Sequence, residues 1–478
     1  MIQREMSGTE TPWTETKQPH SYHFVGVGGI GMSAIAQVLS KQNHIVSGSD
    51  NKYDRQITPD LFSKLKAQGI SLYPQSGSGV KENTDYLVVS SAIEEDNPDI
   101  KKARMLKKTI LKRSSLLAGM FNTKDGIAIG GTNGKTTVSC MVGYLLDYAG
   151  LSPTIIVGGC IINYTNDSCM GNAKTGTSNI MAIEADESDG SIVSYAPHIS
   201  VITNISKDHK PIEKISEMFK TFSRNTKETL ILNADCPRLK MLNLKARKVV
   251  AYGLHNDATI MAKNITREPF RSTFEVNGQH FEVNLPGIHN VSNALAAISV
   301  AQCMSIKDET ISDALRSFKG VQRRMNIIGD FNGIKVIDDF AHNPEKVKAA
   351  INAVRLCSKR VIAVFQPHGF LPARFMKGEF IDSFSSTLSH QDLLFMPEIF
   401  SIGDTANKDI SSADLVQGIR ENGKNAFFIE KRVDIIPEIK KNLQADDCIL
   451  VMGARDNTLT QFCHEILGAI SNSFLLEE

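Results

Sequence analysis

The stretch that decides the fold is GIAIGGTNGKTTVSCMVGYLLDYAG, residues 126–150. It opens with a short apolar run at 127–129, long enough for a buried parallel strand, then passes through a glycine-rich turn into a sequence with helical apolar faces. Glycines in such a turn let backbone amides converge on an anion, and the helix start adds unpaired N–H groups and a positive dipole end. The stretch therefore predicts a phosphate-binding loop.

The polar residues of this turn suit a nucleoside triphosphate. Lys135 is placed to reach the terminal phosphates, and the Thr136 hydroxyl is placed to bind Mg²⁺. The spacing is one residue shorter than the usual GxxxxGK[ST], because Ile129 stands where the first glycine belongs. A Gly-rich turn without a ligand is the alternative. The expected loop residues are Gly131, Thr132, Asn133, Gly134, Lys135, Thr136 and Thr137.

Length and composition indicate a multidomain globular protein. The chain has 478 residues, and one domain per roughly 150 residues suggests three. Hydrophobic content of 41% and charged content of 22% are ordinary. A net charge of +1 gives no whole-chain argument for nucleic acid or anionic membranes as partners. The eight cysteines are scattered, with no CxxC pair and no zinc-ligand cluster, so we expect buried or unreactive thiols.

The first twenty residues are rich in Thr, Glu, Gln and Ser, and they predict a disordered tail. They lack the apolar core of a secretory signal, and no apolar run in the chain is long enough to span a bilayer. We therefore expect a cytoplasmic protein without a membrane partner.

A second glycine motif follows this tail. A strand at 22–27, a glycine-rich turn, a helix at 32–40 and a strand at 44–47 lead to Asp50. This order is the βαβ fingerprint of dinucleotide sites, with an acidic residue where a ribose hydroxyl would bind. By itself the motif fits a nicotinamide cofactor, another nucleotide, or only tight strand-to-helix packing.

Two further segments belong to this first unit. A buried strand at 87–89 ends at Ser90 and Ser91, and Arg113 precedes a helical segment that closes the unit near 122. Ligands collect at the carboxyl ends of strands in a doubly wound sheet, so these hydroxyls are expected near the glycine turn. Ordinary strand-end turn chemistry is the alternative.

Carboxylates follow an apolar strand at 180–183. These are Glu184, Asp186, Glu187 and Asp189. A carboxylate on a strand beside a phosphate loop holds Mg²⁺ directly or through water, because the ion prefers oxygen ligands. An acidic, solvated turn is the alternative. Another strand at 199–202 is followed by His209, which is either a second metal or phosphate contact or a structural histidine.

The region 250–285 predicts short strands with turns, a β-rich insert. The long helix that follows carries His289, Asn290 and Asn293 in its first turns. Asn side chains present a donor and an acceptor, which suits an adenine edge, and they equally suit helix capping.

Eight segments together resemble the Mur ligase family, the ATP-dependent amide ligases that build the peptide of bacterial peptidoglycan. They are GVGGIGMSAIA, SSAI with DNP, LKRSSLLAGM, GTNGKTT, EADESDGS, TNISKDH, HNVSNALAAI and GVQRR. The opening motif, SGSD, SSAI and EADESD look most like the member that joins L-alanine to UDP-N-acetylmuramate, or its relative that reattaches recycled tripeptide.

The resemblance implies an α/β fold of three domains. These are a UDP-sugar-binding Rossmann-like domain at 21–122, a central P-loop ATPase-type parallel sheet with a β-rich insert at 123–322, and an amino-acid-binding Rossmann-like domain at 323–478, after a tail at 1–20. The substrates implied are ATP with Mg²⁺, UDP-N-acetylmuramate and an amino acid, with L-alanine first. We expect a monomer or homodimer.

The resemblance also implies site residues. UDP-sugar contacts would be Gly28, Gly29, Ile30, Gly31, Asp50, Ser90, Ser91 and Arg113. ATP contacts beyond the loop would be His289, Asn290, Asn293, Arg324 and Asp339. Metal ligands would be Thr136, Glu184 and His209. The catalytic set would be Lys135, Glu184, His209, Arg324 and His342. Amino-acid contacts would be His342, His368, Arg374 and Arg455, since a guanidinium can hold a carboxylate by two hydrogen bonds.

The motifs depart from the alanine-adding pattern mostly on the amino-acid side. Asn133 stands where those members usually have His, DDFAHNP replaces DDYGHHP, FQPHGFLPAR replaces FQPHRYTR and MGARD replaces MGAGD. A catalytically silent Mur-like binding protein fits these changes and is an alternative. Folate polyglutamylation and cyanophycin-type ligation are alternatives within the family, and the likeness of the UDP site argues against both. A nicotinamide dehydrogenase explains only the first fifty residues, and a P-loop GTPase would need an NKxD motif that the sequence lacks.

Overall fold

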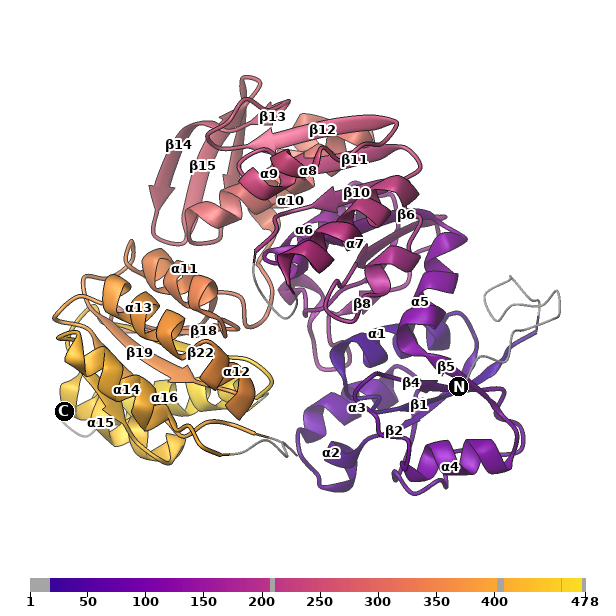
Figure 1. The fold of residues 1–478 in the computed structure, drawn as a ribbon, viewed down its shortest axis with the longest axis horizontal. Coiled ribbons are helices and arrows are strands. Elements are labelled where there is room, and N and C mark those ends of the chain that lie inside the picture. The colour runs from indigo at the N-terminus through magenta and orange to yellow at the C-terminus, as the bar shows by residue number, and fades with distance from the viewer. Residues whose placement is uncertain (1–17, 207–210, 402–407, 457, 475–478) are drawn as a thin grey trace. The chain divides into compact units, whose positions relative to one another are not determined.

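The computed structural model describes residues 18–206, 211–401, 408–456 and 458–474. Residues 1–17 of the predicted tail, and His209, lie outside this part. The chain divides into two compact units (Figure 1). The first comprises Met1–Lys263, Val276–Gln279 and Ser292–Phe318, and the second comprises Asn264–Glu275, His280–Val291 and Lys319–Glu478.

The first unit begins with a five-stranded parallel sheet in the order β3-β2-β1-β4-β5. The strands are β1 (Ser21–Val25), β2 (Ile45–Ser49), β3 (Ser71–Tyr73), β4 (Tyr86–Val89) and β5 (Thr109–Lys112). The helices are α1 (Ile30–Lys41), α2 (Asn51–Asp54), α3 (Pro59–Ala67), α4 (Pro98–Met105) and α5 (Arg113–Asn122). The chain reverses its winding between β1 and β4, so the glycine turn after β1 lies at the topological switch point, where such sheets bind ligands.

A second sheet in the same unit has eight strands in the order β13-β12-β11-β10-β6-β9-β7-β8. Its strands are β6 (Asp125–Gly130), β7 (Thr154–Ile156), β8 (Ala173–Lys174), β9 (Ile180–Glu184), β10 (Ile199–Ile202), β11 (Thr229–Asn233), β12 (Lys248–Gly253) and β13 (Ile260–Met261). Only the β7–β8 pair is antiparallel among these strands. The predicted phosphate loop follows β6, whose neighbours β9 and β10 carry the polar residues discussed below.

Helices and short 3₁₀ turns accompany these strands. They are α6 (Lys135–Tyr148), α7 (Ile212–Asn225), α8 (Pro237–Leu242), α9 (Ile288–Cys303), α10 (Asp308–Ser317), η1 (Ile162–Tyr164) and η2 (Ser191–Ser194). Two of the helices, α9 and α10, come later in the chain, between β16 (Gln279–Val283) and β17 (Asn326–Phe331). The prediction that the segment VVAYGL belongs to the β-rich insert is wrong, because it forms β12 and pairs in parallel with β11. Its Val250 and Tyr252 are buried on one face of the strand, whereas Val249 on the other face is 45% exposed, so the segment contributes one apolar face to the parallel sheet.

The insert itself is a separate three-stranded sheet. It consists of β14 (Lys263–Glu268), β15 (Arg271–Val276) and β16 (Gln279–Val283), in that order. The rings of Phe274 and Phe281 stack with their centroids 5.9 Å apart and are fully buried, so two aromatic side chains provide the core of this small sheet.

The second unit contains a six-stranded sheet in the order β17-β18-β22-β19-β20-β21, with β17 antiparallel. The strands are β17 (Asn326–Phe331), β18 (Ile334–Asp339), β19 (Val361–Gln366), β20 (Leu393–Met396), β21 (Ala426–Phe428) and β22 (Cys448–Gly453). The helices are α11 (Pro344–Val354), α12 (Phe370–Phe375), α13 (Lys377–Thr387), α14 (Ser412–Glu421), α15 (Ile435–Asn442) and α16 (Leu459–Phe474), with η3 at Arg432–Asp434.

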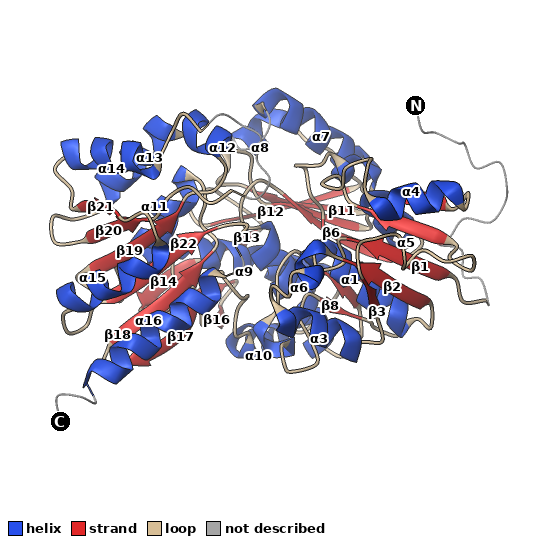
Figure 2. Cartoon of the chain, turned by 90° about the horizontal axis from the view of Figure 1, so that it is seen from below, coloured by secondary structure: helices blue, strands red, loops and turns tan. Residues whose placement is uncertain are grey.

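Helices cover both faces of this sheet (Figure 2). One apolar cluster includes Val347 of α11, Phe384 of α13 and Leu415 of α14, and a second includes Ile439 of α15 and Phe462 of α16. Two apolar layers around a mainly parallel sheet define a doubly wound α/β domain. The predicted α/β fold class is confirmed. Among the described residues, no helix combines the length and apolar character needed to cross a membrane.

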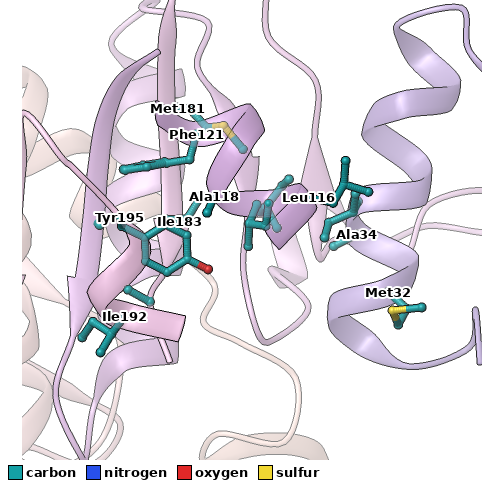
Figure 3. Close-up of a cluster of buried hydrophobic side chains, with 14 of the residues drawn as sticks. Met32, Ala34, Leu116, Ala118, Phe121, Met181, Ile183, Ile192 and Tyr195 are labelled. Carbon is teal, nitrogen blue, oxygen red and sulfur yellow. The ribbon is translucent and has the colours of Figure 1, made fainter. Parts of the chain in front are cut away.

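A single apolar cluster continues from the first sheet of the chain into the second (Figure 3). Leu116 and Ala118 of α5 lie between Ala34 of α1 and Ile183 of β9 in this view. On the same helix, the ring of Phe121 meets that of Tyr195 edge-on, with centroids 5.5 Å apart. Because protein interiors are close-packed, α5 and β9 are expected to move together.

Candidate active site

The glycines of the loop after β6 have conformations and surroundings that few other residues tolerate. Gly131 has φ +132° and Gly134 has φ +85°. A Cβ on Gly131 would lie 1.9 Å from Thr203 Oγ1, and one on Gly134 would lie 2.8 Å from Asn293 Oδ1. The loop therefore packs its backbone directly against the residues after β10 and against α9, as the glycine pattern indicates.

Residues after β10 hold this loop in place. Asn204 Oδ1 accepts hydrogen bonds from Thr132 Oγ1 at 2.7 Å and from the Asn133 backbone N–H at 2.9 Å. Thr203 Oγ1 donates to the Asn133 carbonyl at 2.6 Å, and the Ser206 hydroxyl lies 3.0 Å from Thr132 Oγ1. Thr203 and Ser206 were not predicted as site residues. Their position beyond the strand that neighbours β6 is the signal that could have found them.

The side chains that follow the loop meet carboxylates. Thr136 Oγ1 donates to Glu184 Oε1 at 3.1 Å, and Glu184 Oε2 accepts from the Gly158 backbone N–H at 2.9 Å. Lys135 Nζ donates to Glu187 Oε2 at 2.7 Å and lies 3.9 Å from Asp186 Oδ1. Glu184, Asp186 and Glu187 therefore lie beside the loop, whereas the fourth carboxylate, Asp189, pairs with Arg113. Hydrogen bonds to both carboxylate oxygens orient Glu184.

Burial and charge oppose each other at this lysine. Burial lowers the pKa of Lys135, but the negative charges of Glu187, Asp186 and Glu184 more than reverse this, so the pKa lies above its ordinary value. Burial raises the pKa of Glu187, although the Lys135 ammonium opposes the shift. Lys135 is thus a permanent cation held among carboxylates.

The oxygen donors near Thr136 suit a magnesium ion. In the described part of the chain there is no group of three or more His, Cys, Asp or Glu side chains that could hold a metal. The Thr136 hydroxyl and the Glu184 carboxylate nevertheless lie 3.1 Å apart. Mg²⁺ commonly takes one or two protein oxygens and completes its shell with water and substrate phosphates, so this pair fits the ion. His209, the third predicted ligand, lies outside the described residues.

The glycine turn after β1 is held by Asp50. Gly28 N–H donates to Asp50 Oδ2 at 2.9 Å, and Lys52 N–H donates to Asp50 Oδ1 at 2.9 Å. Asp50 is buried, and both of its carboxylate oxygens accept hydrogen bonds from the backbone. Of its predicted neighbours, Gly29 precedes α1 as its N-cap and Ile30 is 39% exposed.

Arg113 reaches the same turn from the start of α5. A Cβ on Gly31 would lie 3.1 Å from Arg113 Nη1, so the guanidinium rests on this glycine. Arg113 Nη2 also donates to Asp189 Oδ2 at 2.7 Å. Ser90 and Ser91 follow β4, the neighbour of β1, with Ser90 partly buried and Ser91 exposed. The structure therefore brings Gly31 and Arg113 together.

The residues predicted on α9 differ in their surroundings. Asn290 is buried, and its Nδ2 donates to the Pro286 carbonyl at 2.8 Å. Asn293 is also buried and faces Gly134. His289 is exposed. Asn293 is thus the predicted α9 residue that the structure places at the phosphate loop.

In the second unit, Asp339 holds the segment before β17. Its carboxylate accepts from Met325 N–H at 2.7 Å and from Ala341 N–H at 2.8 Å. Burial raises the pKa of Asp339, and the Arg324 charge opposes this. The Arg324 guanidinium carbon lies 4.6 Å from the centroid of the Phe340 ring. Arg324 and Asp339 are thus neighbours at the end of β18.

His342 and His368 are brought together from different strand ends. Their ring centroids lie 5.6 Å apart in an edge-on arrangement. His342 Nδ1 is 2.8 Å from the Phe340 carbonyl, and its Nε2 is 3.4 Å from Lys346 Nζ. Burial, followed by the Lys346 charge, lowers the pKa of His342 well below its ordinary value. His342 is therefore neutral near pH 7.

The two predicted arginines of this unit have different partners. Arg374, on α12, forms an ion pair with Asp409. Arg455 follows β22, is exposed and has φ +60°, a left-handed conformation that favours glycine. Its neighbour Asp456 pairs with Arg432. The structure therefore places His368 beside His342, Arg374 beside Asp409, and Asp456 beside Arg432.

Three family patterns match consecutive parts of the chain. "Mur ligase family, catalytic domain" matches residues 21–125, "Mur ligase middle domain" matches 129–301, and "Mur ligase, glutamate ligase domain" matches 323–455.

Relatives of known name match over nearly the whole length. A UDP-N-acetylmuramate--L-alanine ligase of Sinorhizobium medicae is 34% identical over 453 residues, covering 90% of this chain and 93% of its own. One of Nostoc sp. is 35% identical over 484 residues, covering 93% and 96%. The crystal structure of the UDP-N-acetylmuramate-alanine ligase of Thermotoga maritima superposes with a TM-score of 0.78 at 26% identity, covering 95% of this chain and 99% of that one.

Proposed function

The chain belongs to the Mur ligase family, and from this premise we propose that it is an ATP-dependent ligase that joins L-alanine to the carboxylate of UDP-N-acetylmuramate. The observation that carries the proposal is the loop after β6, in which Lys135 and Thr136 meet the carboxylates after β9. The substrates are taken from the relatives cited above, which are named as L-alanine ligases. The alignment with this chain covers more than nine-tenths of the length of each of them.

ATP would bind at the phosphate loop. The loop of residues 131–137 and the Lys135 ammonium would bind the phosphates, with the Thr132 and Asn133 amides held by Asn204 and with Asn293 of α9 beside the loop. His289, Asn290, Arg324 and Asp339 would complete the nucleotide site, as the family resemblance implies. Mg²⁺, held by Thr136 and Glu184 and in our proposal also by His209, would neutralise charge on the transferring phosphoryl group.

The UDP-sugar would bind at the switch point of the first sheet. The turn containing Gly28, Gly29, Ile30 and Gly31 leads into the start of α1, and the positive end of this helix suits a diphosphate. Arg113 adds a cation beside Gly31. Asp50, Ser90 and Ser91 would contact the ribose and sugar. The amine would be held in the second unit by His342, His368, Arg374 and Arg455. We accordingly propose domain boundaries at 21–122, 123–322 and 323–478.

The chemistry follows from the weakness of a carboxylate as an electrophile, since direct attack by an amine would have to expel oxide. Transfer of the γ-phosphoryl group of ATP to a carboxylate oxygen breaks the bond to the β-phosphate oxygen and gives ADP and an acyl phosphate. Attack by the amine then forms the amide and releases phosphate. The side chains mainly position the reactants and stabilise charge, so orientation supplies much of the rate. We place this activity in the cytoplasm, where ATP is available, for a monomer or homodimer.

A phosphate-release screen tests the proposal. The protein is incubated with ATP, Mg²⁺ and UDP-N-acetylmuramate, and with single amino acids or short peptides. Phosphate release that depends on both the UDP-sugar and L-alanine is the expected result. Release with a tripeptide but not with L-alanine would indicate a recycling ligase. Binding of the UDP-sugar without phosphate release for any amine would indicate a silent binding protein.

A further inference from the structure

One short turn connects the cations of the two proposed nucleotide sites. Glu187 accepts the hydrogen bond of Lys135 at 2.7 Å, and Asp189, two residues later, accepts that of Arg113 at 2.7 Å. Lys135 belongs to the phosphate loop and Arg113 rests on Gly31 of the first glycine turn. The segment 186–189, here called the acidic turn, therefore bridges two sites that lie on different sheets of the first unit.

The acidic turn is internally braced. Asp186 Oδ1 and Oδ2 accept from the Ser188 backbone N–H and hydroxyl, both at 2.9 Å. Asp189 Oδ1 accepts from Ser191 N–H at 2.9 Å, and Gly190 N–H donates to the Glu187 carbonyl at 3.2 Å. Because these hydrogen bonds link the residues of the turn to one another, we expect the turn to move as a unit. A displacement of Glu187 should therefore also displace Asp189.

The elements that carry the two cations share one apolar core. Arg113 begins α5, and the acidic turn connects β9 to η2. Leu116 and Ala118 of α5 belong to the same cluster as Ile183 of β9 and Ile192 of η2 (Figure 3). Since this core holds α5, β9 and η2 together, the braced turn between β9 and η2, with its two ion pairs, is the part that can shift when ligands bind.

We infer that Asp189 is a positioning residue that couples the two sites, so that ATP and the UDP-sugar each tighten the binding of the other. The inference rests on the proposed function. Both ligands are polyanions, and each competes with a carboxylate of the acidic turn for its cation. If the first ligand displaces the turn, the second no longer has to break that contact, and this gives positive coupling. Coupling through binding free energies is reciprocal.

The test is a binding cycle on the full chain. Calorimetry measures the Kd of UDP-N-acetylmuramate with and without a saturating non-hydrolysable ATP analogue and Mg²⁺. We expect the analogue to tighten binding about fivefold or more in the unmodified protein. In Asp189→Asn the effect should fall to less than about twofold, while binding without nucleotide becomes tighter because Arg113 loses its competitor. Asp189→Glu should restore most of the coupling.

The matched control is Asp313→Asn, which removes a carboxylate from the exposed ion pair with Arg316 in α10 of the same unit. It should keep the full coupling. Thermal unfolding of each variant checks that it is folded. If Asp189→Asn is active and its coupling is unchanged, this inference alone is overturned. The same holds if the unmodified protein is active and shows no coupling. Failure of the unmodified protein to bind either nucleotide would overturn the proposed function with it.

Discussion

Lys135 donates from Nζ to Glu187 Oε2 at 2.7 Å, with its side chain only 12% exposed. A buried ammonium needs a counter-charge, because desolvation of an unpaired ion is costly. Glu187 supplies it. In the proposed ligase, phosphate oxygens would take over this role, so the pair keeps the lysine charged and oriented before ATP binds.

Replacing Lys135 by Ala is expected to abolish product formation. The substitution removes the cation that would stabilise the transferring phosphoryl group, and loss of such a contact reduces kcat by about 10²-fold or more. Phosphate release measures the loss. Binding of UDP-N-acetylmuramate should persist, since that site lies on the first sheet. Loss of sugar binding would contradict this division between the sites. Lys220→Ala, in an exposed pair with Glu217, is the control.

Gly131→Ala should impair nucleotide binding and stability together. The new Cβ would meet Thr203 Oγ1 at 1.9 Å and the Thr203 backbone nitrogen at 3.0 Å, at a φ of +132°. Gly150→Ala is the matched control, because Gly150 also has a positive φ of +79° but open space around its Cβ position. We expect Gly150→Ala to cost about 1 kcal/mol from backbone strain. Gly131→Ala should cost more and weaken binding of an ATP analogue. Equal effects in both variants would refute the packing argument.

Arg455 occupies a backbone conformation that favours glycine, with φ +60°. Arg455→Gly should raise the free energy of unfolding by about 0.5–1 kcal/mol, because the left-handed strain exceeds the entropic cost of glycine. Arg455→Ala keeps the strain and should change stability little. Both variants lose the guanidinium, so both should raise the KM for the amine if Arg455 binds the amino-acid carboxylate. Denaturant unfolding and kinetics separate the two effects. If the KM for the amine is unchanged in both variants, Arg455 does not bind the amino acid.

The lowered pKa of His342 predicts a pH dependence of stability. The unfolded histidine takes up a proton near its ordinary pKa of 6.5, whereas the folded one stays neutral to lower pH because of burial and Lys346. The unfolded chain therefore binds more protons below about pH 6.5, and the stability contributed by neutral His342 is lost as pH falls. One such group gives a slope of at most about 1.4 kcal/mol per pH unit.

Denaturant unfolding at several pH values between 5 and 7.5 measures this slope. In His342→Gln the decline on acidification should be smaller than in the unmodified protein. His280→Gln, whose side chain is 76% exposed, serves as the control and should retain the full slope. Identical pH profiles for the unmodified protein and His342→Gln would show that this histidine is not responsible.

Local patterns were sufficient for much of the fold. The predicted strand at 199–202 is β10 as the structure has it, and the helix predicted from Lys135 is α6. In such segments the apolar residues recur at the spacing of a helix or a strand, and glycine or proline marks the ends. These features depend on local backbone preferences, so they can be recognised in the sequence. The segment VVAYGL was misassigned because a short apolar strand looks the same in an insert and in the edge region of a parallel sheet.

The sequence by itself determined the phosphate loop, the glycine turn after β1 and the carboxylates after β9. These features depend on positive φ angles, helix starts and strand ends, all of which are encoded within a few neighbouring residues. Only the tertiary structure decided which charged groups meet. Arg113 and Asp189 are 76 positions apart, and Asn204 reaches Asn133 across 71. Their contacts follow from the strand order β10-β6-β9 and from the packing of α5. Both depend on burying apolar residues that are far apart in the sequence, so no local sequence pattern predicts them.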